Sequence, residues 1–331
     1  MINDNWVVIT SIYAPKIQLT HFLENGWSIV VVGDSKTPSA KWSVLNHSNL
    51  HFLSVELQDK MFPDLSRRIG FGTYARKNIG YIYARRHGAK VIFDTDDDTF
   101  LREEGIQSFR QISNLSQGQI TGSGFFNPYL LFAKDSLMWP RGYPLSRVAS
   151  DRVTLNRNLK IIEKTQIGTF EILQTLVNLE PDLDAIFRLT NTEIRFDYEV
   201  DSRIFKLDKG VYSPGNTQST FWLDEAKFQY LYIPKSVSFR FCDILKMYIA
   251  QTFCSFAYTG FWSEQIRNPH NYLEDFRSEI ECYLSVESLI EVLKNLSYSS
   301  LASTYESLMR NGFVSSEDAE LSHLFELEMC D

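Results

Sequence analysis

The sequence lacks the features of a secreted, membrane-spanning or nucleic-acid-binding protein. Its four cysteines, Cys242, Cys254, Cys282 and Cys330, show no C-x-x-C spacing, so neither a zinc site nor a disulfide framework is indicated. No segment reaches the roughly 20 apolar residues of a membrane span, and no basic stretch precedes an apolar run at the N-terminus. A net charge of −8 argues against nucleic acid as a partner. We therefore expect a cytoplasmic protein without a signal peptide.

The composition is that of an ordinary globular protein, with 44% apolar and 22% charged residues. Its first hundred residues alternate between apolar, β-rich runs and segments with helical spacing. The expected strands are 6–13, 27–34, 50–57 and 90–94, and the expected helices are 15–26 and 73–89. This alternation predicts an α/β fold with a mostly parallel central sheet covered by helices on both faces.

The remainder of the chain is less regular. Residues 105–240 are rich in Gly, Pro, Asn and Ser, which predicts long ordered loops around short strands such as 185–190 and 236–241. Residues 242–258 have the pattern of a helix. We expect one large domain over residues 1–276. Leu/Ile spacing predicts a helical C-terminal appendage over 277–331, packed against the core.

Four aspartates, Asp94, Asp96, Asp97 and Asp98, occur within five positions of "VIFDTDDDTF", directly after the fourth expected strand. Ligands of parallel sheets bind outside the carboxyl ends of the strands. Asp34 follows the second expected strand, so it should lie at the same edge of the sheet. Because carboxylates this close repel one another, we interpret the cluster as a ligand site rather than a solvated loop.

Three patterns could explain the cluster. An EF-hand loop is excluded, because Thr99 stands where its glycine belongs and Gly105 where its final glutamate belongs. A phosphatase of the haloacid dehalogenase type, with Asp94 as its first aspartate, stays open as an alternative. The D-x-D motif of nucleotide-sugar glycosyltransferases fits best. Its carboxylates bind a hard divalent cation with room left for phosphate and water, and the cation neutralises a departing diphosphate.

Several longer blocks carry a family resemblance, among them "VVVGDSKTP", "YARKNIGYIYA", "GAKVIFDTDDD", "MWPRGYPL", "YSPGNTQSTFW" and "RNPHNYLEDF". From about residue 6 to 277 the chain resembles the STELLO family of proposed glycosyltransferases (the DUF288 domain), with a D-x-D region like that of family 2 GT-A enzymes. The resemblance implies a GT-A-like fold, Mn²⁺ or Mg²⁺, and a UDP-sugar or other nucleoside-diphosphate-sugar donor. The implied acceptor is a glycan or a lipid-linked molecule. The protein could then associate peripherally with a membrane that contains the acceptor, or form a homo-oligomer.

The GT-A resemblance also suggests residue roles. Asp96 is the expected metal ligand, with Asp98 a second candidate and Asp97 behind them. Asp94 would face the metal or the ribose, and His270 would be a third metal ligand.

At the nucleotide, Asp34 would accept a hydrogen bond from the base, and Thr10 and Ser11 could contact the nucleotide. Arg76, Lys77 and Asn78 would face the diphosphate or the acidic cluster, although an exposed helix face explains these three equally well.

An inverting transferase needs a carboxylate that accepts the proton of the acceptor hydroxyl. Asp243, at the start of the helix 242–258, is the first candidate, although helix capping would also explain it. Asp182 and Asp184 are the other candidates. The loop with Asn216, Gln218 and Trp222 is expected to contact a sugar. A non-catalytic binding module with the same fold is a further alternative.

Overall fold

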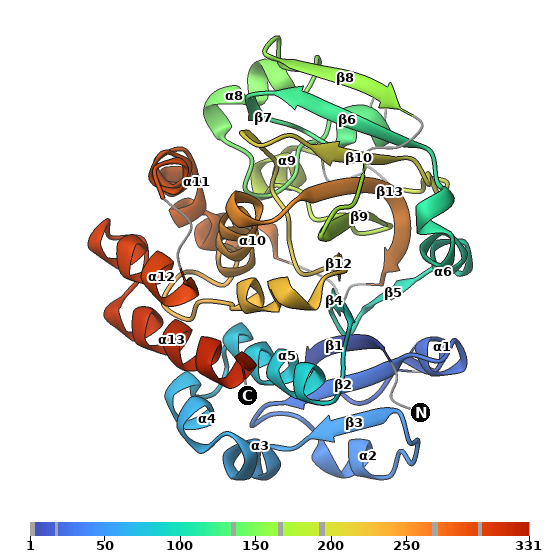
Figure 1. The fold of residues 1–331 in the computed structure, drawn as a ribbon, viewed down its shortest axis with the longest axis vertical. Helices are drawn as coiled ribbons and strands as arrows, with labels where there is room; N and C mark the ends of the chain where they lie inside the picture. Colours follow the sequence, from blue (N-terminus) through green and yellow to red (C-terminus); the bar gives the residue numbers. More distant parts are fainter. Residues whose placement is uncertain are drawn as a thin grey trace.

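The computed structural model describes residues 4–16, 19–133, 137–164, 168–191, 196–266, 271–296 and 300–330. These residues form an α/β fold around an 11-stranded mixed sheet, which confirms the expected fold class (Figure 1). The strand order is β3-β2-β1-β4-β12-β9-β13-β10-β6-β8, and β5 pairs with β13. The strands are β1 (Asn5–Ser11), β2 (Ser28–Gly33), β3 (Leu50–Leu53), β4 (Val91–Thr95), β5 (Thr99–Leu101), β6 (Gln117–Gly122), β8 (Leu159–Lys164), β9 (Ile172–Asn178), β10 (Ile204–Leu207), β12 (Ser219–Trp222) and β13 (Phe256–Gln265), and a small second sheet pairs β7 (Gly124–Phe125) with β11 (Val211–Tyr212).

The N-terminal half of the sheet is parallel, because β3, β2, β1 and β4 all run in one direction. Successive residues of a strand point to opposite faces, so Val7 and Val8 of β1 belong to two different hydrophobic cores. Helix α5 (Lys77–Arg86) covers the Val8 face, whereas α1 (Leu19–Glu24) and α6 (Glu103–Arg110) cover the other (Figure 1). This packing buries β4 on both faces, and Asp96, Asp97 and Asp98 follow at its carboxyl end.

In the second half of the sheet, one end of each of three further strands lies at the same edge. Strand β12 is antiparallel to β4, so β12 begins where β4 ends. Strand β9 is antiparallel to β12, and β13 is parallel to β9, so both of these strands end at that edge too. We call this edge the rim.

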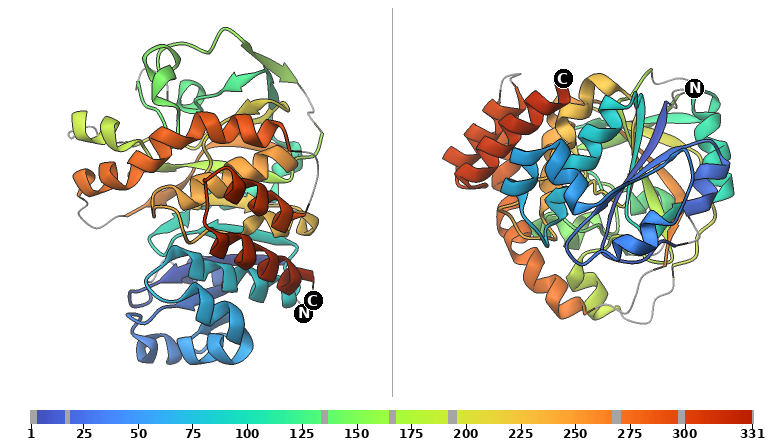
Figure 2. Two further views of the ribbon diagram at one scale, coloured as in Figure 1. Left: turned by 90° about the vertical axis from the view of Figure 1, so that its left-hand side faces the viewer. Right: turned by 90° about the horizontal axis from the view of Figure 1, so that it is seen from below.

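Three C-terminal helices follow, as the Leu/Ile spacing predicts: α11 (Tyr272–Lys294), α12 (Leu301–Arg310) and α13 (Ser316–Cys330). Figure 2 shows α13 beside α4 (Pro63–Ile69) and α5, α12 beside α13, and α11 beside α9 (Ala185–Thr190) and α10 (Cys242–Phe253). The buried Asp318 of α13 accepts hydrogen bonds from the Tyr232 hydroxyl at 2.7 Å and from the Lys235 and Ser236 amides at 2.8 Å. The helices therefore pack tightly on the core, and a domain boundary at residue 276 stays a prediction.

The other helices surround the sheet. They are α2 (Ser39–Ser43), α3 (Val55–Met61), α4 (Pro63–Ile69), η1 (Tyr74–Arg76), η2 (Ile112–Asn114), α7 (Tyr129–Phe132), α8 (Leu145–Asp151), α9 (Ala185–Thr190), η3 (Glu225–Leu231) and α10 (Cys242–Phe253). No helix in the described ranges is long and apolar enough to cross a membrane.

Several expected element boundaries were wrong. Residues 185–190 form helix α9 rather than a strand, because the Asp184 carboxylate caps it and accepts from the Ile186 amide at 2.8 Å. Residues 236–241 form turns. The third strand ends at Leu53, because Ser54 caps helix α3, and the expected helix 242–258 ends at Phe253.

Candidate active site at the rim

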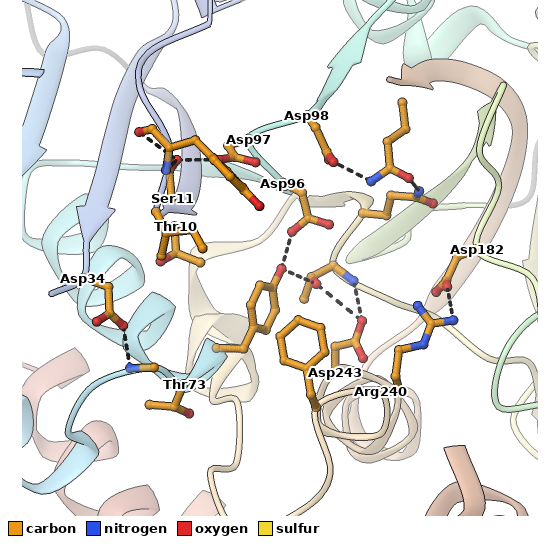
Figure 3. Close-up of a pocket in the computed structure, with 18 of the residues that line it drawn as sticks. Thr10, Ser11, Asp34, Thr73, Asp96, Asp97, Asp98, Asp182, Arg240 and Asp243 are labelled. Carbon is orange, nitrogen blue, oxygen red and sulfur yellow. Dashed lines mark hydrogen bonds and ion pairs between the residues drawn. The ribbon is translucent and has the colours of Figure 1, made fainter. Parts of the chain in front are cut away.

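A cavity of about 510 Å³ opens at the rim (Figure 3). Its volume lies within the roughly 300–1,000 Å³ of typical small-molecule sites. Its lining residues lie at or after the ends of β1, β2, β4, β9 and β13, or at or before the starts of α5, β12 and α10, and Arg141 lies in the loop before α8. They are Thr10, Ser11, Ile12, Tyr13, Lys16, Asp34, Lys36, Gly72, Thr73, Tyr74, Asp96, Asp97, Asp98, Arg141, Asp182, Thr217, Gln218, Phe239, Arg240, Asp243 and Gln265. Sheet topology thus gathers residues from most of the chain into one pocket.

The acidic turn, which we define as Asp96, Asp97 and Asp98, lies in the middle of this pocket (Figure 3). One oxygen of each carboxylate is held by the protein. The Tyr74 hydroxyl donates to Asp96 Oδ1, the Ser11 hydroxyl donates to Asp97 Oδ2, and the Gln265 amide donates to Asp98 Oδ1 at 2.7 Å. These bonds orient the three carboxylates within the pocket.

The charges of the acidic turn are poorly compensated. The pKa of Asp96 is raised to about 7, mainly by burial and also by Asp98 and Asp97, against the opposing effects of Lys77 and the Tyr74 hydroxyl. Burial also raises the pKa of Asp97. A divalent cation would relieve this repulsion, so the residues fit such an ion. Within the described ranges no three Asp, Glu, His or Cys side chains converge on one point. A cation here would therefore have one or two protein carboxylates, with phosphate and water completing its coordination.

Asp94 does not belong to the pocket, which corrects its expected role at a metal or a ribose. Its side chain is fully buried on the helical face of β4, where Lys77 Nζ lies 2.8 Å from Oδ1 and Lys246 Nζ lies 2.6 Å from Oδ2. The Tyr81 hydroxyl donates to Oδ1 at 2.8 Å. Burial alone would raise the pKa of Asp94, but the two ammonium groups outweigh burial and lower it. We assign Asp94 to the structural joint between β4, α5 and α10.

Arg76, Lys77 and Asn78, at the start of α5, are buried as well. They neither line the pocket nor lie on an exposed face. Arg76 donates to Gln58 and Ser66, and Asn78 exchanges two hydrogen bonds with the backbone of Ile233. Lys77 lies beneath the acidic turn, with Nζ 3.9 Å from Asp96 Oδ1. Of the three, only Lys77 has its charge near the acidic turn.

The β1–β2 end of the pocket contains Thr10, Ser11 and Asp34, the residues expected to contact the nucleotide. Both oxygens of Asp34 accept backbone hydrogen bonds, from Ser35 at 2.5 Å and from Gly72 at 2.9 Å. Asp34 therefore also fixes the loop before η1. Tyr13, Lys16 and Lys36 line this end too, although sequence reasoning did not single them out.

The opposite end of the pocket contains two carboxylates held by one guanidinium. Arg141 donates to Asp182 from Nε at 2.9 Å and from Nη2 at 2.6 Å, and to Asp243 from Nη1 at 2.8 Å and from Nη2 at 2.9 Å. Arg240 Nη2 lies 3.6 Å from Asp182 (Figure 3). Asp243 precedes most of α10, whose N-terminal dipole favours a carboxylate there. Both arginines were missed, because only folding brings them to the aspartates.

The remaining predicted residues fall elsewhere. Asp184 caps α9, is buried and does not line the cavity, so we no longer consider it a base. Trp222 is fully buried and cannot stack on a sugar in the pocket. Asn216 supports the pocket from behind, by donating to Asp182 at 2.9 Å. His270 lies outside the described residues, so its role as a metal ligand stays a prediction.

The protein thus belongs to the α/β class and has a polar, acidic pocket where its strands end. Over 264 residues, or 75% of the chain, it is 30% identical to the protein named Probable glycosyltransferase STELLO1 of Arabidopsis thaliana, and it is 27% identical to STELLO2 of the same plant over 266 residues. The chain is a distant homologue of these proteins, as the sequence blocks indicated. It spans about a third of their length.

No protein-family model matches the chain. Among solved structures, the mannosyltransferase PcManGT from Pyrobaculum calidifontis, in complex with GDP-Man and Mn²⁺, is similar over 99% of this chain and 86% of its own. The two share 8% sequence identity with a TM-score of 0.33. This likeness is too weak to carry an inference about function.

Proposed function

We propose that this protein is a metal-dependent glycosyltransferase that moves a sugar from a nucleoside-diphosphate-sugar, with UDP-sugar the first choice, to a hydroxyl of a glycan or lipid-linked acceptor. The observation that carries the proposal is the order of groups along one pocket. The polar residues after β1 and β2, the acidic turn, and the carboxylate pair Asp182 and Asp243 follow one another across the pocket (Figure 3). Distant homology to two proteins named as probable glycosyltransferases supports the same reading.

The β1–β2 end would bind the nucleoside. Thr10, Ser11 and Asp34 supply hydrogen-bonding groups, the exposed ring of Tyr13 offers a stacking surface, and Lys16 is close enough to the acidic turn to favour an anion there. Asp96 and Asp98 would hold Mn²⁺ or Mg²⁺ through their second oxygens. When bound, such an ion neutralises charge on the departing diphosphate.

Asp243 is the proposed base of an inverting transfer. Its carboxylate lines the cavity on the far side of the acidic turn from the nucleotide end, where an acceptor hydroxyl could approach. Two hydrogen bonds from Arg141 hold the carboxylate in place, and the base of an inverting transfer must accept the proton of the acceptor hydroxyl. Asp182 shares Arg141 but has Asn216 as a further donor, and we assign it to orienting the acceptor.

The phosphatase alternative is disfavoured by the position of Asp94. A phosphatase of the D-x-D type uses that first aspartate as its nucleophile, but Asp94 has no exposed surface and is paired with two lysines. A non-catalytic binding module stays a distinct alternative, because it would keep the fold and lose the metal-linked nucleotide site.

Thermal unfolding with nucleoside diphosphates and nucleotide-sugars, with and without Mn²⁺, tests the proposal. We expect one nucleotide to raise Tm only with Mn²⁺, because a ligand at 100 times its Kd stabilises by about 2.7 kcal/mol. Asp96→Asn should abolish the increase. The matched control Asp64→Asn, at an exposed position outside the pocket, should keep it. If no nucleotide shows a Mn²⁺-dependent increase, the binding-module alternative is favoured instead.

A further inference from the structure

A chain of hydrogen bonds crosses the pocket from the acidic turn to Asp243 (Figure 3). The Tyr74 hydroxyl donates to Asp96 Oδ1 and lies 2.7 Å from Thr217 Oγ1. Thr217 in turn lies 3.4 Å from Asp243 Oδ2 through its hydroxyl and 3.3 Å through its amide nitrogen. Two hydroxyl groups therefore connect the proposed cation site to the proposed base.

The two hydroxyls have one proton each, and the 2.7 Å contact between their oxygens requires one of these protons, which leaves two arrangements. In the first, Thr217 donates to Tyr74 and Tyr74 donates to Asp96. In the second, Tyr74 donates to Thr217 and Thr217 donates to Asp243. The geometry permits either atom of the Tyr74–Thr217 pair to be the donor. Asp96 and Asp243 therefore compete for one set of hydroxyl protons.

A cation at the acidic turn would change the outcome of this competition. The first arrangement is favoured while the charge of Asp96 is uncompensated, because a charged acceptor strengthens a hydrogen bond. Positive charge beside Asp96 weakens that pull and favours the second arrangement, in which Asp243 gains a hydroxyl donor. Cation binding and hydrogen bonding at Asp243 should then favour each other, as linkage requires.

The ring of Tyr74 is held in place independently of this chain. Phe239 packs edge-on against it with ring centroids 5.6 Å apart, and Lys77 Nζ lies over the ring, 5.2 Å from its centroid. Removal of a single hydroxyl should therefore leave the ring and the backbone where they are, which makes the chain accessible to conservative substitutions.

We propose that Tyr74 and Thr217 are positioning residues that couple divalent-cation binding at the acidic turn to Asp243. This inference rests on the proposed function, because it assumes that a cation binds at Asp96. The coupling would align the base only when the cation site is filled, so that acceptor activation accompanies a bound donor.

A double-mutant cycle on Mn²⁺ affinity tests the coupling without an assay of activity. The Kd of Mn²⁺ alone is measured by the electron paramagnetic resonance of the free ion at pH 7.5, for wild type, Thr217→Val, Asp243→Asn and the double variant. We expect Asp243→Asn to weaken Mn²⁺ binding about threefold more in the wild-type background than in Thr217→Val. Direct electrostatic attraction persists in both backgrounds, so only the hydroxyl path produces the difference.

Thr217→Ser is the control, because it keeps the hydroxyl and should retain the wild-type coupling. Equal effects of Asp243→Asn in both backgrounds, or loss of coupling in Thr217→Ser, would overturn the inference and leave the proposed function intact. If Asp243→Asn fails to fold, Thr217→Val alone must weaken Mn²⁺ binding by about threefold, and unchanged affinity overturns the inference. Absence of Mn²⁺ binding to the wild type would overturn this inference, whereas the proposed function is tested separately by the nucleotide-dependent change in Tm with Mn²⁺.

Discussion

Asp94 and Asp96 are two positions apart, yet their neutralisation should affect stability in opposite directions. Asp94 is fully buried with Lys77 and Lys246 at 2.8 and 2.6 Å, so Asp94→Asn leaves two ammonium groups without their counter-ion in the core. Removal of one partner from a buried ion pair costs about 3–5 kcal/mol. At roughly 2 °C per kcal/mol for a chain of this size, Tm should fall by about 6–10 °C.

Asp96→Asn should leave the stability of the metal-free protein unchanged or raise it at pH 8. Burial and the neighbouring Asp98 raise the pKa of Asp96, so its ionised form is unfavourable in the folded protein. An amide keeps the shape and removes the repulsion.

Urea and thermal unfolding of both variants in EDTA at pH 8 measure these effects, with the surface substitution Asp64→Asn as a reference. A loss below about 1 kcal/mol for Asp94→Asn would show that the buried pairs are not as described. An equally large loss for Asp96→Asn would show that the acidic turn stabilises the fold by itself.

Two further predictions concern the core. Burial and the nearby Glu279 raise the pKa of Asp184 to about 7. The folded protein therefore holds a proton that the unfolded chain releases above about pH 4, and stability should fall as the pH rises from about 4 to 7. Asp184→Asn, which can still cap α9, should reduce this dependence of stability on pH, measured by urea titrations at pH 5 and 8. An unchanged pH dependence would contradict the assignment. Gly80→Ala should destabilise by about 1–3 kcal/mol, because its Cβ would lie 2.7 Å from Val32 Cγ2 and 2.8 Å from Val8 Cγ1. An open helix position would instead gain about 1 kcal/mol from the same change, so a stabilised variant would refute this close packing of α5 on the sheet.

The sequence by itself determined which strand ends lie together at the rim. Apolar runs alternating with helical segments specify a parallel sheet. In such a sheet the carboxyl ends of β1, β2 and β4 lie at one edge, together with the residues there. Thr10, Asp34 and Asp96 lie there for this local reason. The Leu/Ile spacing of the C-terminal helices is equally local, because each helix shows its own apolar face.

Tertiary structure decided which polar groups meet. Arg141 contacts Asp182 and Asp243, which are 41 and 102 residues away along the chain. No short-range pattern encodes such partners, since they depend on how β9 and α10 pack beside the loop of Arg141. The orientation of Asp94 is of the same kind. A strand pattern cannot tell an aspartate that faces the rim from one turned inward to buried lysines, because that choice depends on which helices cover the strand.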